Sequence, residues 1–286
     1  MTELTEKRPV LDHGYVQYID HMGDDLSPLE AARLSTGRET GVDVQADDKL
    51  RSRLWSEFHT SPFEMAELVV EIQCPIFVLR QIDRHRSIDY DGTTIESQDE
   101  NARQFMSRNE FSGRYSTMPD LFFIPPAERI QKKGVANKQG SEGGLDPELQ
   151  KKIRSQFEDQ TQGSRAFYEQ LIGAGVASEI ARVALPLNQY TKIRLKGSLL
   201  SWLKVLDLRL RLDVQLECRV FAQEIAKIVR RLWPRMWSVF EEHTLYAVTI
   251  PATAREALIK LLADQHSDLV KLLKPSEPRG LVPEGD

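Results

Sequence analysis

The sequence predicts a single α/β domain with a helical majority, and three observations lead to that fold class. The chain has 286 residues, 41% of them hydrophobic, which is enough for one large domain with a buried core. Residues 65–73 alternate apolar and polar side chains, as a strand does. Longer stretches at 146–172 and 199–232 carry helical patterns, and neither an internal repeat nor a clear linker divides the chain.

The segment before the strand is predicted to hold two helices. Ser27 and Glu30 fit the two ends of a capping box, which predicts a short helix from residue 27 to residue 35 with Gly37 as its stop signal. Apolar side chains recur at helical spacing within 47–58, and this pattern predicts the second helix.

A change of period marks the strand and the helix that follows it. From residue 66 to residue 73 the even-numbered positions are apolar and are expected to face the core, and Val69 is the one apolar residue at an odd-numbered position. Pro75 is predicted at the first position of a helix, where its missing N–H costs nothing. Arg80 and Arg84 are four residues apart on that helix and therefore share a face.

Polar and irregular sequence follows this helix. Residues 87–118 are rich in Asp, Ser, Asn and Gly, and a connection of this length without regular structure is often functional. Residues 122–124 fit a short strand, and residues 131–146 are predicted to form a flexible surface loop.

The second half of the chain is predicted to be mostly helical. Asp146 is the expected cap of a long helix. The alternation of Leu and Arg at 208–212 leaves the local structure there open between helix and strand. The expected elements are helices at 146–172, 178–185, 199–232 and about 252–273, a strand at 190–196, and a tail with the composition of a disordered segment.

Charge and cysteine content argue against several functions. The net charge of −5 disfavours a general nucleic-acid binder, which would usually carry a basic excess. Six arginines nevertheless fall within the segment from Arg80 to Arg114, and this local cluster favours a pocket for a small anion. Cys74 and Cys218 form neither a disulfide framework nor the spacing of a zinc site, so no metal site is expected.

The location is predicted from what the sequence lacks. No apolar run approaches the roughly 20 residues that a membrane helix needs. The first residues contain no hydrophobic signal region. We therefore expect a cytoplasmic protein with no membrane partner and no nucleic-acid partner.

Two short polar runs are the strongest candidates for chemistry. Arg84, His85 and Arg86 supply many N–H donors and permanent positive charge, which suits phosphate, pyrophosphate or an electron-rich ring. The run from Ser107 to Ser116 combines hydroxyls, a glycine and arginines that can close around a phosphate. Taken alone, the first run also fits a solvated basic turn, and the second also fits an ordinary polar turn.

Taken in order, the two runs resemble the signature of the flavin-dependent thymidylate synthases. That family has an RHR triplet, then Ser, Asn-Glu and Ser-Gly-Arg-Tyr-Ser, and this chain has RHR at 84–86 and SRNEFSGRYS at 107–116. Four further blocks resemble the family in the same order: AARLS at 31–35, HTSPFE at 59–64, PIFVLRQ at 75–81 and ARVALPLN at 181–188. The collinear likeness extends over about residues 14–232.

The resemblance implies a fold, a reaction and partners. The fold would be a single α/β domain with a mixed or antiparallel sheet and several long helices over residues 1–250, followed by a C-terminal helix and flexible tail at 251–286. Enzymes of this family methylate dUMP to dTMP with methylenetetrahydrofolate as the carbon donor. Reduced FAD supplies the hydride, and NADPH usually reduces the flavin. The active form is a homotetramer with its sites at subunit interfaces.

The resemblance also implies roles for individual residues. Arg209 resembles the arginine that polarises the uracil, which would be electrostatic catalysis without a covalent nucleophile. The positions that resemble dUMP contacts are Arg80, Gln81, Arg84, Glu110, Ser112, Gly113, Arg114, Arg182 and Arg209. The positions that resemble FAD contacts are Ser35, His59, Ser61, Glu64, Arg84, His85, Arg86, Asn109 and Glu110.

The chain departs from the family pattern in two respects. An insertion at about residues 88–106 separates the RHR triplet from the serine run. Several positions also differ from residues that the family commonly has there, some of them near the flavin, and they are therefore not assigned to the site. These positions are Met65, Ser198, Leu200, Lys204 and Asp213.

Three other functions remain open at this point. A cysteine-dependent thymidylate synthase would need a reactive thiolate, but Cys74 has no partnering histidine nearby in sequence and Cys218 lies on an apolar helical face. A non-catalytic nucleotide-binding protein would not need Arg209, and a colourless preparation that refuses FAD would favour it. A related pyrimidine-nucleotide one-carbon transferase would differ in its product, and only the altered region beside the pocket motivates it.

Overall fold

The computed structural model describes residues 2–85, 107–135, 138–262, 269–270 and 273 of the chain. The chain divides into two compact units, Met1–Leu245 and Tyr246–Asp286. The predicted insertion at 88–106 and the end of the C-terminal tail lie outside the described residues. The predicted boundary at residue 250, where the synthase-like part would end, stays a prediction.

A five-stranded antiparallel sheet is the centre of the first unit, with the strand order β1-β2-β3-β7-β4. β3 pairs with β7 along its full length, from Glu67 opposite Ser198 to Pro75 opposite Tyr190. β4 is a short edge strand on the other side of β7. The strands are β1 (Arg8–Val10), β2 (Gly14–Met22), β3 (Glu67–Pro75), β4 (Ser107–Glu110) and β7 (Tyr190–Ser198).

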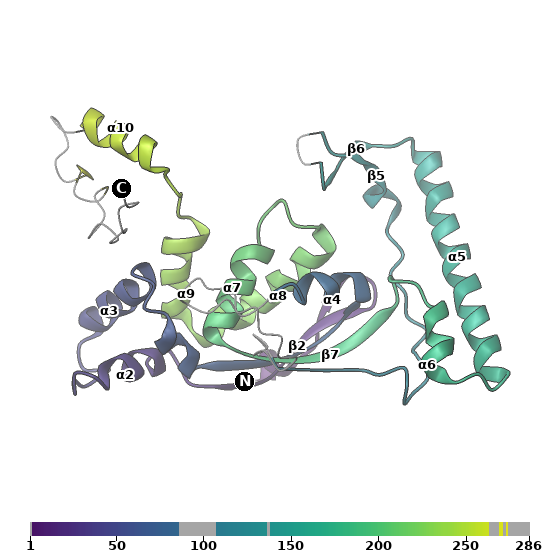
Figure 1. The fold of residues 1–286 in the computed structure, drawn as a ribbon, viewed down its shortest axis with the longest axis horizontal. Helices are drawn as coiled ribbons and strands as arrows, with labels where there is room; N and C mark the ends of the chain where they lie inside the picture. Colours follow the sequence, from purple (N-terminus) through teal and green to yellow (C-terminus); the bar gives the residue numbers. More distant parts are fainter. Residues whose placement is uncertain (1, 86–106, 136–137, 263–268, 271–272, 274–286) are drawn as a thin grey trace, which may run out of the picture. The chain divides into compact units, whose positions relative to one another are not determined.

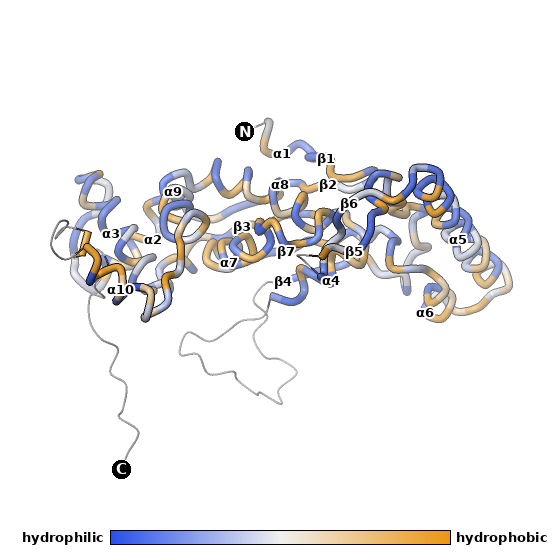
Figure 2. Tube along the Cα trace, turned by 90° about the horizontal axis from the view of Figure 1, so that it is seen from above, coloured by the Kyte–Doolittle hydropathy of each residue, from blue (hydrophilic) through white to orange (hydrophobic). Residues whose placement is uncertain are grey.

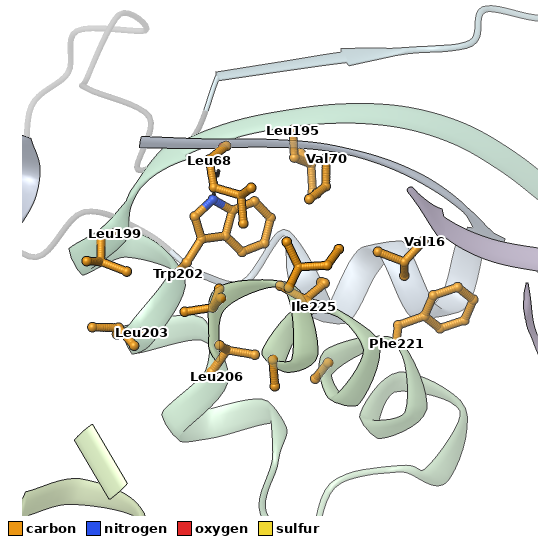
Figure 3. Packing of buried hydrophobic residues seen from close by; sticks show 14 of the residues in the cluster. Val16, Leu68, Val70, Leu195, Leu199, Trp202, Leu203, Leu206, Phe221 and Ile225 are labelled. Carbon is orange, nitrogen blue, oxygen red and sulfur yellow. Dashed lines mark hydrogen bonds between the residues drawn. The ribbon is translucent and has the colours of Figure 1, made fainter. Parts of the chain in front are cut away.

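Three helices cover one face of this sheet (Figure 1): α4 (Ile76–Ile82), α7 (Leu199–Arg209) and α8 (Leu216–Leu232). The covered face is apolar because every second residue of a strand points to it. In Figure 3, Val16, Leu68, Val70 and Leu195 of the sheet lie against residues of α7 and α8, which include Trp202, Leu206, Phe221 and Ile225. This contact is the main hydrophobic core.

α7 is attached to the beginning of β3. The N–H of Leu199 donates to the carbonyl of Ala66 at 2.7 Å, and the indole Nε1 of Trp202 donates to the carbonyl of Leu68 at 3.1 Å. Ser198 caps the helix, because its Oγ accepts from the N–H of Ser201. Figure 2 shows α7 as largely hydrophobic, in contrast to the hydrophilic edge strand β4.

The remaining elements of the first unit are those outside the five-stranded sheet and its three covering helices. Among them, Asp25 caps α9 by accepting from the N–H groups of Arg235 and Met236, at 3.1 and 2.9 Å. The other elements are α1 (Thr2–Thr5), α2 (Ser27–Arg33), α3 (Val44–Ser56), η1 (Ser61–Met65), η2 (Ala127–Arg129), β5 (Gln131–Lys133), β6 (Ser141–Gly144), α5 (Pro147–Gly173), α6 (Ser178–Ala181), η3 (Arg182–Ala184), α9 (Pro234–Phe240) and the π-helical η4 (Glu241–Leu245).

The predicted fold class is confirmed, since the chain has an antiparallel sheet and several long helices. The strand predicted at 65–73 is β3, and its even-numbered apolar positions are fully buried. The helix predicted at 146–172 is α5, and Asp146 caps it by accepting from Glu148 and Leu149. The strand predicted at 190–196 is β7, which ends two residues later.

The capping box predicted for the first helix is wrong. Ser27 is already helical, and its Oγ accepts from the N–H of Asp24 instead of a helix N–H. The carboxylate of Asp24 accepts from the N–H groups of Leu26 and Ser27, at 2.8 and 3.2 Å. The N–H of Glu30, which a capping box would bond to the Ser27 hydroxyl, instead donates to the carbonyl of Leu26 at 2.9 Å, because the helix begins one residue earlier with Leu26 as its cap residue.

Other local predictions also needed correction. Residues 131–146 contain the two-stranded β5–β6 hairpin and are not a simple loop, and the irregular segment 87–118 contains β4. Residues 122–124 form a single bridge, Phe122 with Gln189, and no strand. Pro75 ends β3, one residue before α4, and the alternation at 208–212 is the end of α7 followed by a turn. β1 and β2 were not predicted.

The helix predicted at 252–273 is described as α10 (Ala252–Leu262), and most of its predicted remainder lies outside the described residues. None of the helices in the described parts of the chain is long and apolar enough to cross a membrane.

Leu206→Ala should lower the free energy of unfolding by about 2–5 kcal/mol, because it leaves a cavity in the core between the sheet and α7. Leu212→Ala makes the same chemical change at a side chain that is 88% exposed, and it should change stability by less than about 0.5 kcal/mol. Chemical denaturation followed by circular dichroism measures both. Equal losses in the two variants would contradict the placement of α7 in the core.

Candidate active site

β4 places its side chains alternately on the two faces of the sheet. Glu110 lies on the helix-covered face, where Thr191 Oγ1 donates to its Oε1 at 2.8 Å. Arg108, on the same face, donates to the carboxylate of Asp83 just beyond α4 at 2.5 Å. Asn109 pairs with Arg194 and lies on the opposite, open face. The adjacent residues Asn109 and Glu110 are therefore available to ligands on different sides of β4.

A tight turn follows β4 and carries the predicted phosphate-binding run. The carbonyl of Ser112 accepts from the N–H groups of Tyr115 and Ser116, at 3.1 and 3.3 Å. Gly113 is buried in this turn, and a Cβ there would lie 2.7 Å from Met118 Sδ and 3.4 Å from Arg182 Cδ. The absence of a side chain at Gly113 thus lets Arg182 approach the turn backbone closely.

Two cations flank this turn. Arg182 begins η3 and lies against Gly113, and Arg114 lies within the turn itself. Arg114 Nε is 3.4 Å from the Glu179 carboxylate, and both side chains are about half exposed. An ion pair that exposed is weak, so Arg114 can exchange this partner for a ligand anion at little cost.

Arg209 is the last residue of α7 and is held by α4. Its Nη2 donates to the carbonyl of Gln81 at 2.7 Å. Its Nε is buried and has no hydrogen-bond partner within the described parts of the chain. A buried donor without a partner is costly. Arg209 therefore presents a fixed positive charge with an unsatisfied donor, as a ligand site for an electron-rich group requires.

His85 lies close enough to Arg209 for its titration to be affected. Burial, and then the positive charge of Arg209, lower the pKa of His85 to about 4. The imidazole is therefore neutral at pH 7. Its Nε2 is buried and, as far as the structure is described, has no hydrogen-bond partner.

The structure thus brings together many of the residues predicted to bind the nucleotide. Gln81 and Arg209, predicted for dUMP, form one cluster with His85, which was predicted for FAD, and the Arg108–Asp83 bond joins this part of the chain to β4, which the Ser112 turn follows. Arg80 and Arg84 are exposed on and just beyond α4. Arg86 lies outside the described residues.

Besides Asn109 and Glu110 on β4, four further residues predicted to contact the flavin lie near the beginning of β3. α2 packs against η1, so Ser35, just beyond α2, and Ser61 and Glu64, in η1, belong to the same corner of the unit. All three side chains are exposed, and His59 is also exposed, with Nε2 3.7 Å from the Glu57 carboxylate. No hydrogen bond among the described residues joins this group to the Gln81–Arg209 cluster.

Sequence reasoning missed residues that support the cluster. Gln81 Nε2 donates to Gln215 Oε1 at 2.6 Å, and Thr191 and Asp83 hold β4 residues as described above. Gln215 and Gln81 are 134 residues apart in sequence, so no local motif links them. The alternation of buried and exposed residues along β7 is the signal that places Thr191 on the helix-covered face.

Two of the five positions that depart from the family pattern have structural roles. Ser198 caps α7 and Leu200 is in the core, whereas Met65 is exposed at the end of η1. Asp213 lies 3.4 Å from Arg211 Nε, and Lys204 is exposed on α7.

Comparison with protein families gives a match to the family described as "Thymidylate synthase complementing protein" over residues 17–235. Curated proteins named "Flavin-dependent thymidylate synthase" are similar over most of the chain. The protein from Thermus thermophilus is 39% identical over 257 residues, and the protein from Wolbachia pipientis is 34% identical over 263 residues. These alignments cover 90% and 92% of this chain, and 86% of each relative.

A solved structure is also similar. The UMP/dUMP methylase PolB from Streptomyces cacaoi, bound with 5-Br dUMP, superposes with a TM-score of 0.68 at 24% sequence identity. The superposition covers 83% of this chain and 98% of that chain. This likeness shows that the two chains share a fold.

Arg209→Met should raise the pKa of His85 above about 4, because the positive charge that disfavours the imidazolium is removed while the burial remains. Arg211→Met removes the same charge two residues further on, where the side chain is exposed, and should leave the titration unchanged. Nuclear magnetic resonance of the His85 ring from pH 3 to pH 8 measures both. An unchanged His85 titration in folded Arg209→Met protein would contradict the proximity of the two groups.

Proposed function

Because the chain belongs to the thymidylate synthase complementing protein family, we propose that it is a flavin-dependent enzyme that methylates dUMP to dTMP with methylenetetrahydrofolate as the carbon donor. The observation that carries the proposal is the cluster of Arg209, Gln81 and neutral His85, which the Arg108–Asp83 bond joins to β4, the strand that the Ser112 turn follows. Such a site offers a cationic turn for a phosphate and a fixed guanidinium for a ring.

The nucleotide would bind with its phosphate at the turn after β4. Arg114 and Arg182 flank Gly113 there, and guanidinium groups bind phosphate oxygens through paired N–H donors. Arg80 and Arg84 are exposed and can add positive charge from α4. Gln81 and Glu110 offer an amide and a carboxylate for the base and the sugar.

We assign to Arg209 the polarisation of the uracil. A guanidinium that is already in place stabilises negative charge as it develops on the ring, without reorganising during the reaction. The bond to the Gln81 carbonyl provides that placement, and the buried Nε is the unsatisfied donor. Because His85 is neutral, it does not compete with Arg209 for negative charge.

The residues proposed for FAD fit a flavin in their chemistry. Ser35, His59, Ser61 and Glu64 offer hydroxyl, imidazole and carboxylate groups on an exposed corner, while Arg84 and Arg86 offer cations for the diphosphate. Phe58, next to His59, is 58% exposed and has φ +62°, which is rare for a residue with a side chain and recurs at functional sites. When bound and reduced, FAD supplies the hydride. Asn109 and Glu110 would complete its contacts.

The cysteines support a reaction without a thiolate nucleophile. Cys74 and Cys218 are both buried in the core. Burial raises the pKa of Cys74, and burial likewise raises the pKa of Cys218 to about 11. A thiol of that kind is protonated at pH 7 and inert. The cysteine-dependent route to dTMP therefore receives no support from these side chains.

We further propose a homotetramer with sites between subunits and NADPH as the reductant of the flavin. Leu34, Phe58 and Met65 are apolar, are more than half exposed, and lie beside the proposed flavin residues, as expected for a surface that assembly would cover. A cytoplasmic location, and the division into a synthase-like part at 1–250 and a C-terminal helix and tail at 251–286, stay predictions from the sequence.

The purified protein should be yellow and should form dTMP from dUMP, methylenetetrahydrofolate and NADPH under anaerobic conditions. Chromatography and mass spectrometry of the nucleotide product provide the measurement, and omission of each component in turn provides the controls. A methylated product from another pyrimidine nucleotide in place of dTMP would replace this proposal with the related transferase. A colourless protein that does not take up FAD would contradict the enzyme altogether.

Arg209→Ala should lower kcat by about 10²–10³-fold while the dissociation constant for dUMP changes less, because the charge of Arg209 matters most where negative charge develops in the transition state. Arg211→Ala is the matched control and should retain nearly full kcat, since Arg211 is exposed and paired with Asp213. Steady-state kinetics and calorimetric titration separate the two quantities. Equal losses in kcat and in affinity would contradict this role, and a loss of affinity with unchanged kcat would assign Arg209 to binding alone.

A further inference from the structure

Gln215 contacts the proposed site although neither its own motif nor the resemblance assigns it a role. It immediately precedes α8, and its Oε1 accepts from Gln81 Nε2 at 2.6 Å. It also lines a cavity of about 500 Å³ between the start of α4, α5 and the start of α8. The side chain therefore stands between this cavity and the Gln81–Arg209 cluster.

The backbone of Gln215 is held from both sides. Its carbonyl accepts from the N–H groups of Cys218 and Arg219 at 3.0 Å, and so begins α8. Arg219 Nη1 donates back to the carbonyl of Leu212 at 2.7 Å, which closes the turn between α7 and α8. The backbone from which the Gln215 side chain reaches Gln81 is thus held in place.

A buried ion pair adds to this rigidity. Glu217 is 3% exposed, and both of its carboxylate oxygens accept from Arg129, at 2.7 Å from Nε and 3.2 Å from Nη2. Arg129 Nη1 in turn donates to Ser141 on the β5–β6 hairpin. The first turn of α8, and Gln215 with it, is therefore tied to the hairpin.

The bond to Gln215 decides which end of the Gln81 amide faces a ligand. An amide has donors at one end and an acceptor at the other. Because Gln81 Nε2 donates to Gln215, the Oε1 atom of Gln81 is the atom left to accept from a ligand N–H or hydroxyl. The main-chain carbonyl of the same residue holds Arg209. Gln81 therefore bonds to Gln215 through its side-chain amide and to Arg209 through its main-chain carbonyl.

We propose that Gln215 is a positioning residue for the nucleotide: it orients the Gln81 amide, and through Gln81 it sets the acceptor that meets the base or sugar of dUMP beside Arg209. This inference rests on the proposed function, and it adds a residue from the loop between α7 and α8 to the machinery. The effect should fall mainly on nucleotide binding, because Gln215 acts on Gln81, whereas the charge that acts in the transition state belongs to Arg209.

The test uses four forms of the full-length, FAD-loaded protein: wild type, Gln215→Met, Gln81→Met and the double variant. Methionine keeps the length of the side chain and removes the amide. Gln215→Met should raise KM for dUMP about tenfold, which corresponds to about 1.4 kcal/mol, the upper range for one hydrogen bond. It should lower kcat by less than threefold. In the Gln81→Met background the same substitution should change KM by less than twofold.

Two more variants complete the design. Gln160→Met makes the same change on the opposite wall of the same cavity, at an exposed residue of α5, and should leave KM and kcat unchanged. Gln215→Glu retains an acceptor for Gln81 Nε2 and should return KM to within threefold of wild type. Thermal unfolding of every variant identifies a loss of fold, which would lower the midpoint temperature without the split between KM and kcat.

The outcomes separate this inference from the proposed function. If wild type forms dTMP and Gln215→Met keeps its KM, the positioning role is overturned and the enzyme function stands. An equal rise of KM from Gln215→Met in the presence and absence of Gln81 would also overturn it, because the effect would not pass through Gln81. If wild type neither binds nor converts dUMP, both statements fail together.

Discussion

The length of β3 determines where the candidate active site forms. α7 begins beside the first residues of β3, where Leu199 N–H bonds to the Ala66 carbonyl, and α4 follows its last residue, Pro75. The nine residues of β3 span about 30 Å. The eleven residues of α7 and the seven of α4 have a combined axial length of about 27 Å. The two helices start at opposite ends of β3, lie on the same face of the sheet, and together are about as long as β3. Their C-terminal ends, which carry Arg209 and Gln81, therefore meet.

Sequence reasoning succeeded where the deciding interactions are local or periodic. The alternation within β3 is a direct consequence of one buried face, and Asp146 caps α5 with donors only two and three residues away. It failed for β4, a four-residue edge strand whose exposed side chains show no apolar period, because only the pairing with β7 makes it a strand. The candidate site was likewise predicted only in part, because some of its contacts join residues far apart in the sequence. The predicted residues lie in contiguous runs, whereas Gln215 reaches Gln81 across 134 residues, and tertiary structure alone brings them together.

The two faces of the sheet manage their polar groups differently. On the open face the charges are paired with one another, with Arg194 to Glu71 at 2.7 Å and Lys196 to Glu67 at 2.6 Å. On the helix-covered side, Arg209 Nε and His85 Nε2 are buried without partners among the described residues. Each buried nitrogen without a partner, these two among several in the described residues, is kept at a cost to stability. Binding of a ligand with matching polar groups at this cluster would offset that cost, as the proposed function expects.

The position of β4 at the sheet edge reconciles the two sets of proposed contacts. Asn109 and Glu110 are adjacent, yet they lie on opposite faces, with Asn109 opposite Arg194 and Glu110 bonded to Thr191. A ligand confined to one face of a sheet interior could not reach both side chains. An edge strand has no neighbour on its outer side, so a ligand that passes around the edge of β4 can contact Asn109 on the open face and Glu110 on the covered face. The proposed flavin and nucleotide contacts on consecutive residues are therefore compatible, because β4 is the last strand of this sheet among the described residues.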